Sequence, residues 1–199
     1  ASTKLLQETL VVDSAAVSTP SSQLQQAEEL TDEVRAAQLT RRIADQGNPS
    51  AQLKLGVMYA RGKGVTRDTG EAAIWVRRAA EQGQAIAQFK LAMLYAHGYG
   101  VDKDEKEAAR WCVLAAKQGH SGALFNLGLM HASGLGVERD KHAAMMYFEK
   151  AVEQGHEAAK FNLDILRTTN NKPKGWLVPV VIFMLSCGAG AWWALGRGW

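Results

Sequence analysis

The chain has 199 residues, and its 23 Lys and Arg against 20 Asp and Glu give a net charge of +3. So mild a charge, with no basic patch interleaved with aromatic residues, argues against a nucleic-acid partner. The two cysteines, Cys112 and Cys187, lie in very different segments, so a disulfide framework is not expected.

Residues 1–22 form an N-terminal arm outside any repeat pattern. The arm contains Ser, Thr and Ala, with Pro20 near its end, and its first ten residues lack the apolar core of a signal peptide. Whether a signal was removed is left open. The stretch KLLQETLVV at residues 4–12 is compatible with a short helix. We expect either a flexible or docking arm, or a leader without a role.

A repeat with a period of 36 residues follows the arm. Each unit has an aspartate just before an apolar run, where a helix N-cap belongs, and two units add a glutamate three residues later, as in a capping box. A Gln-Gly pair ends the same helix, with the glycine at C′. The aspartates are Asp32, Asp68, Asp104 and Asp140, the glutamates Glu71 and Glu107, and the glycines Gly47, Gly83, Gly119 and Gly155.

A second helix is expected after each of these glycines. Asn48 and Pro49 have the character of an N-cap and a first helical residue, and apolar residues follow at helical spacing. Gly56, Ala92 and Gly128 share a column inside this helix, and the recurring glycine suggests that another backbone packs tightly there. The predicted solenoid spans 23–167, with a cap helix at 32–46, repeats at 48–83, 84–119 and 120–155, and a final helix at 156–167.

Glycine pairs of the form G-x-G also recur in each unit. A phosphate-binding loop would require a strand before the glycines, and here a helix precedes them. We therefore interpret them as structural turns in which positive φ requires glycine. The residues are Gly62, Gly64, Gly98, Gly100, Gly134 and Gly136.

These columns together resemble the Sel-one-like repeat family, which is related to the tetratricopeptide repeats. The similarity lies in the A-x-G-x-G-V pattern at 60–65, 96–101 and 132–137, and in the helix ends at 80–83, 116–119 and 152–155. The resemblance covers about residues 32–167. It implies an all-α fold, an α/α solenoid of helix pairs, which acts as a non-catalytic adaptor between proteins, often at membranes.

No catalytic or metal-binding constellation emerges from the remaining residues. The five histidines form no H-x-x-x-H pair and join no cysteine at zinc spacing. Cys112 aligns with Val76 and Phe148, as a small core residue would. We therefore expect no enzyme activity, no cofactor and no metal.

One surface column is suggestive of partner binding. In related solenoids the first helix lines the concave face, and a row of Lys and Asn there could hold a carboxylate or an extended backbone. An ordinary solvated face is the alternative. The column consists of Lys54, Lys90, Asn126 and Asn162, preceded by Gln52 and Gln88 and extended by Arg61, His97 and Ser133.

A C-terminal transmembrane helix is predicted at 175–196, after a polar linker at 168–174 and before a tail at 197–199. Residues 176–195 contain no charge. A helix of this length crosses about 30 Å of hydrocarbon. Tryptophans flank the run as they do at membrane interfaces. Ser186, Gly188 and Gly190 provide small residues for contact with partner helices, or accompany a passive anchor.

The flanking charges predict the orientation. Arg167, Lys172 and Lys174 precede the span and only Arg197 follows it, which favours a cytoplasmic repeat domain over a periplasmic one. The sequence thus predicts a single-pass, membrane-anchored protein-interaction adaptor with lipid around 175–196. The alternative is a constitutive accessory subunit of a larger integral membrane complex for transport, secretion or respiration, with membrane proteins as partners.

Overall fold

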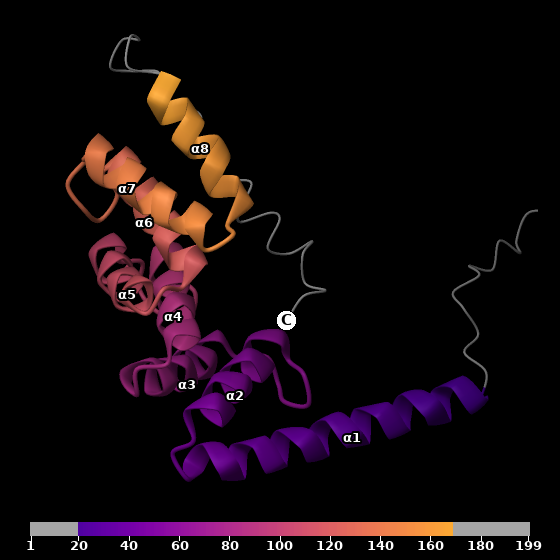
Figure 1. The fold of residues 1–199 in the computed structure, drawn as a ribbon. Coiled ribbons are helices and arrows are strands. Elements are labelled where there is room, and N and C mark those ends of the chain that lie inside the picture. The colour runs from indigo at the N-terminus through magenta and orange to yellow at the C-terminus, as the bar shows by residue number, and fades with distance from the viewer. Residues whose placement is uncertain (1–19, 169–199) are drawn as a thin grey trace, which may run out of the picture.

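Most helices of this chain begin or end next to a residue of its aspartate or glycine columns. A computed structural model describes residues 20–168, and within that range all regular structure is helical. The helices are α1 (Pro20–Asp45), α2 (Pro49–Arg61), α3 (Thr69–Glu81), α4 (Ala85–His97), α5 (Glu105–Lys117), α6 (Ser121–Ser133), α7 (Lys141–Glu153) and α8 (Glu157–Thr168). They stack in chain order into a solenoid, as Figure 1 shows, and the predicted all-α repeat fold is confirmed.

The first helix is longer than the sequence pattern predicts. α1 begins at Pro20, so Asp32 lies inside it and is not an N-cap. The physical reason is that the residues between Pro20 and Asp32 are mostly good helix formers, with proline at the first position. In Figure 1 the N-terminal half of α1 projects beyond the other helices.

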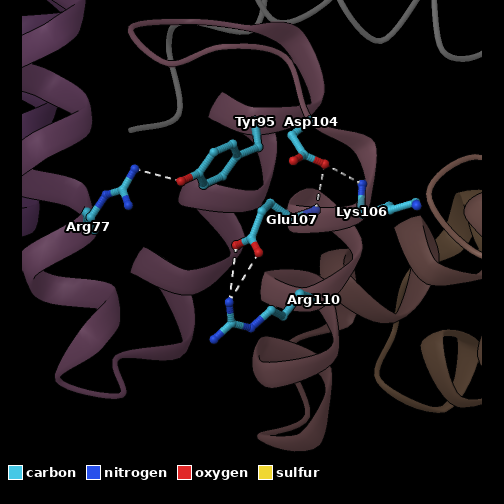
Figure 2. Close-up of polar contacts among 6 residues, drawn as sticks. All are labelled: Arg77, Tyr95, Asp104, Lys106, Glu107 and Arg110. Carbon is cyan, nitrogen blue, oxygen red and sulfur yellow. Dashed lines mark hydrogen bonds and ion pairs between the residues drawn. The ribbon is translucent and has the colours of Figure 1, made fainter.

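The other three aspartates do cap helices. The Asp104 carboxylate accepts hydrogen bonds from the backbone N–H groups of Lys106 and Glu107 at 2.9 and 3.0 Å (Figure 2). Asp68 and Asp140 cap α3 and α7 in the same way. Each cap therefore satisfies N–H groups that the first turn of a helix leaves without a partner.

The capping boxes, however, are only half formed. The N–H of Asp104 donates to the carbonyl of Tyr95, so it does not need the glutamate side chain. The Glu107 carboxylate instead accepts from Arg110 at 3.1 Å, as Figure 2 shows, and Glu71 accepts from the Trp75 indole at 3.1 Å. The predicted glutamate contact is wrong because the preceding helix already supplies an acceptor.

The G-x-G turns are also the joints between repeats. All six of their glycines have positive φ, between 69° and 81°. A Cβ added at the second glycine of each turn would overlap the backbone carbonyl of the preceding repeat, at Glu33 for Gly64, Thr69 for Gly100 and Glu105 for Gly136. These positions therefore exclude every side chain for two independent reasons.

The core consists of small and large residues in alternate columns. Leu55, Leu91 and Leu127 are all fully buried, at 0% exposure. A Cβ on Gly56 would lie 3.0 Å from the carbonyl oxygen of Ala72, so a backbone does pack tightly there. At Gly128 the close neighbour is the Phe148 ring instead. The two glycines let α3 approach α2 and α7 approach α6.

Candidate functional site

The predicted partner-binding column runs from an exposed end to a buried end. Lys54 on α2 is exposed, whereas Lys90 on α4 and Asn126 on α6 are half-buried. Asn162 on α8 is only 5% exposed, and its amide donates to the carbonyl of Ala158 at 2.9 Å. The column is therefore open to a partner at Lys54, Lys90 and Asn126, while Asn162 serves its own helix.

Gln52 belongs to the interior, contrary to its predicted place on the concave surface. It is 5% exposed, and its amide nitrogen donates to the carbonyl of Ala44 at 3.2 Å. Its amide oxygen accepts from Gln82 at 2.7 Å. A buried amide with both ends paired braces three helices, so Gln52 is a structural residue.

Gln88 repeats this arrangement one unit later. Its nitrogen donates to the carbonyl of Ala80 at 3.2 Å, and its oxygen accepts from Gln118 at 2.8 Å. Gln118 also donates to the carbonyl of Gly83 at 2.8 Å, which ties the ends of two repeats together. The equal spacing of Gln52–Gln82 and Gln88–Gln118 was the signal that could have identified this brace from the sequence.

Lys90 has an unusual electrostatic environment. The pKa of its ammonium is lowered from 10.5 to about 7, chiefly by burial and in addition by repulsion from Arg61. Lys90 in turn contributes to the lowered pKa of His120, although burial is the larger cause there. Arg61, the last residue of α2, thus lies near Lys90 in the middle of α4, and an anionic partner would stabilise both charges.

Stacked rings connect the first helices of successive repeats. The Phe89 ring on α4 lies 4.5 Å from the imidazole of His120, and Phe125 on α6 lies 4.3 Å from His156. His120 is also the N-cap of α6, since its Nδ1 accepts from the N–H of Ala123 at 3.2 Å. An accepting Nδ1 and a lowered pKa both favour the neutral ring.

A groove of about 450 Å³ opens beside these stacks, between α4, α5 and α6. Its walls are largely apolar, and Met93 and Leu129 belong to them. Asn126, half-buried, lines the groove and approaches the Met93 sulfur at 3.4 Å. The groove also has polar lining residues, which are His97, Lys103, Glu105, Ser133 and His156.

Sequence reasoning found part of this groove and missed the rest. His97, Ser133 and Asn126 belong to the predicted surface column and line the groove, whereas that column contains neither Met93 nor the buried Leu129. Cys112 also lines the groove, but it is fully buried and its thiol pKa is raised to about 12 by burial. The thiol is therefore unreactive, as a core cysteine is.

The predicted membrane contacts Ser186, Gly188 and Gly190 lie outside the described residues, as does the whole 175–196 span. Between residues 20 and 168, none of the helices combines the length and apolar character that crossing a bilayer requires. In the same range no three His, Cys, Asp or Glu side chains are grouped as a metal site would need.

Comparison with known proteins places these features in a family. A family model described as the Sel1 repeat matches residues 27–48, 49–84, 85–120 and 121–156, more than half of the chain. No curated protein matches the chain.

Two solved structures are similar over most of the described region. One is a protective antigen of uropathogenic Escherichia coli strains with an SLR fold, at 34% identity and a TM-score of 0.65, covering 70% of this chain and 31% of that one. The other is a Sel1 repeat protein from Oxalobacter formigenes, at 32% identity and a TM-score of 0.63, covering 73% of this chain and 65% of that one.

The chain thus spans less than two thirds of the length of either protein. Sel1 repeats typically act as scaffolds for protein–protein interaction, and their fold is in general non-catalytic. With four matched repeats and the helix pairs that they predict, the chain belongs to the Sel1 repeat family.

Proposed function

We propose that this protein is a membrane-anchored adaptor which binds a protein segment along the concave side of α2, α4 and α6. The observation that carries the proposal is the apolar groove between α4, α5 and α6. Phe89, which lines this groove, is followed in α4 by the half-buried Lys90. An apolar wall with a few polar groups is typical of peptide-binding surfaces. The family supports the general role, because Sel1 repeats mediate protein–protein interactions.

The groove and the lysines suggest the chemistry of the bound segment. An apolar side chain would enter beside Met93 and Leu129, and a carboxylate would pair with Lys90 and Lys54. Asn126 would donate to or accept from the backbone of the segment. The expected partner therefore presents an acidic group close to an apolar anchor.

Lys90 would link this binding to pH. With a pKa of about 7, Lys90 is largely neutral at pH 8, and a carboxylate beside it would favour the charged form. Binding at pH 8 would then take up a proton from solution, and affinity would fall as the pH rises above 7.

Site-specific photo-crosslinking tests the concave surface in native membranes. A photoreactive residue at Met93 should crosslink one protein partner, whereas the same residue at Ile74, which is 47% exposed on α3, should not. Lys54→Glu with Lys90→Glu should reduce the Met93 product severalfold while helicity is unchanged. Equal crosslinking from Ile74, or a yield insensitive to both lysines, would remove the groove from the mechanism.

The membrane part of the proposal depends on the charge-free run at 176–195. We expect the full chain to resist extraction from membranes at alkaline pH and a chain ending at Thr168 to be released. The flanking charges suggest a cytoplasmic repeat domain. In right-side-out vesicles, protease would then cleave this domain only after the vesicles are opened. Release of the full chain would contradict anchoring by this segment.

A second candidate is an accessory subunit of an integral membrane complex. Ser186 and Gly190 are four residues apart, a spacing of small residues that permits close contact between membrane helices. Gly190→Leu should then release a stoichiometric membrane partner in mild detergent, while Lys90→Glu should not. The reverse pattern favours the concave surface as the main contact.

A further inference from the structure

Among the described residues, α1 lacks the partner helix that α3, α5 and α7 each have. α3, α5 and α7 are second helices of their repeats, and each packs on the first helix that precedes it. Trp75 of α3, for example, clusters with Ala51 and Leu55 of α2. α1 aligns with these second helices, but among the described residues no first helix comes before it.

This absence leaves an apolar patch open on α1. One repeat later, the corresponding positions are Ala72, Trp75 and Ala79, with exposures of 2%, 3% and 0%. On α1 the residues are Ala36, Leu39 and Ile43, which we call the α1 patch. All three are exposed, Leu39 by 59% and Ile43 by 39%. The patch has the pattern of a helix interface without its second half.

A second copy of the chain is a poor occupant for the α1 patch. Among the described residues no second helix follows α8, so a head-to-tail contact would formally complete one repeat. However, the side of α8 that would meet the patch carries the exposed Lys160, Asp164 and Arg167. Burying these charges against Leu39 and Ile43 would be costly. α8 therefore presents a polar side where a second helix would pack.

Asp164 adds a steric argument against that contact. It aligns with Gly56, Ala92 and Gly128, where the close helix approach leaves room for no side chain larger than a methyl group. A Cβ at Gly128 would already lie 2.5 Å from the Phe148 ring. A carboxylate at this position prevents a second helix from packing on α8 as α7 packs on α6.

We propose that residues 4–12 of the same chain cover the α1 patch as a short helix. Leu6 and Leu10 are four residues apart, and Leu5 and Val12 are seven apart, so all four lie on one side of a helix. This apolar side matches the α1 patch in length and character. The order of the elements is also that of the other repeats, in which the covering helix precedes the covered one.

The linker between residues 4–12 and α1 is long enough for this contact. Seven residues, 13–19, join the segment to Pro20, and extended they reach about 23–25 Å. At 1.5 Å per residue, the path along α1 from Pro20 back to Ala36 is about 24 Å. Residues 4–12 then form a helix about 13 Å long, antiparallel to α1 and long enough to cover Ala36 to Ile43.

A designed disulfide tests the contact in the full-length protein. In a Cys187→Ser background, Leu6→Cys with Leu39→Cys should form an intramolecular disulfide on mild oxidation, identified by mass spectrometry of the joined peptides. The control pairs Leu6→Cys with Gln38→Cys, which is exposed one residue earlier, about 100° around the helix. The control should give a several-fold lower yield.

Two outcomes of the disulfide experiment would contradict the proposal. Dimers linked through Leu39→Cys would overturn the proposal in favour of a second copy, and equal yields from both pairs would overturn it as well.

Hydrogen exchange provides an independent measurement. Leu6→Glu with Leu10→Glu should speed exchange at residues 36–43 several-fold, whereas Lys4→Glu should not; unchanged exchange in the first variant would refute the contact.

Discussion

The Phe89 ring and the His120 imidazole stack at 4.5 Å, and this pair joins the first helices of two consecutive repeats. Phe125 and His156 form the same pair one unit later, at 4.3 Å. Phe161 occupies the third position of the phenylalanine column, where it is 55% exposed. The next repeat covers Phe89 but not Phe161, as expected of a solenoid in which each repeat is stabilised by its neighbours.

The stack should contribute measurably to stability. Phe89→Ala is expected to lower the free energy of unfolding by about 2–4 kcal/mol, because it removes both packing and an aromatic pair. Phe161→Ala is the matched control and should cost less than about 1 kcal/mol, since that ring is more than half exposed. Urea denaturation measures both, and equal costs would show that the stack adds nothing.

His120 combines stacking with helix capping, and two substitutions separate these roles. His120→Asn keeps an N-cap acceptor for the N–H of Ala123, whereas His120→Ala loses it. We expect the alanine variant to be less stable than the asparagine variant by about 1 kcal/mol. If the two variants unfold at the same urea concentration, the cap of α6 does not depend on the side chain.

The glycine turns offer a test in which backbone conformation and packing are separable. Gly83 and Gly100 both have positive φ, so alanine at either should cost about 1–2 kcal/mol. A Cβ at Gly83 meets nothing within 4 Å, whereas at Gly100 it overlaps the carbonyl of Thr69. Gly100→Ala should therefore lower the melting temperature clearly more than Gly83→Ala. A smaller loss at Gly100 would mean that the repeat joint is not tightly packed.

Gly128→Ala tests the close approach of α6 and α7. Alanine favours a helix by about 1 kcal/mol over glycine, but its Cβ would overlap the Phe148 ring. Overpacking costs of about 1–3 kcal/mol should make the net effect destabilising. Phe148→Leu, which is destabilising alone, should be partly compensated by Gly128→Ala in the double variant. If the losses of stability in the two single variants simply add in the double variant, the strain does not arise between residue 128 and the Phe148 ring.

Lys90 should make stability depend on pH. Its pKa is lowered from 10.5 to about 7 in the folded protein, so between these values the unfolded chain binds more protons and stability rises with pH. Lys90→Met should therefore be more stable than the parent at pH 6, and this advantage should shrink as the pH rises from 7 towards 10.5. The exposed Lys54→Met is the control, with no such trend expected. A constant difference across this range would contradict a desolvated Lys90.

Much of the fold could be predicted because its signals are local. An aspartate N-cap needs only the next turn of backbone, and a glycine with positive φ needs only its own conformation, so Asp68, Asp104 and the four Gln-Gly pairs mark the helix ends in the sequence. The prediction was wrong at Asp32 because residues 20–31 continue the helix without a break. A capping residue marks a helix start only when the chain before it is not helical.

The candidate site depended on contacts that no single column contains. Gln52 and Gln88 have the composition of surface residues, yet each is buried because a glutamine 30 residues later and a carbonyl eight residues earlier pair with its amide. The altered pKa of Lys90 likewise arises from burial and from Arg61 of the preceding repeat. Neither effect is visible until the repeats are stacked.

The sequence by itself therefore determined the repeat, its period, the ends of most helices and the structural role of the G-x-G turns, since these follow from local backbone geometry. Tertiary structure decided which polar residues are buried, where the apolar groove opens and which side of α1 and of α8 is exposed. The physical reason is that burial and desolvation depend on neighbours about one repeat away, as Leu39, exposed on α1, and Trp75, buried on α3, demonstrate at the same position of the repeat.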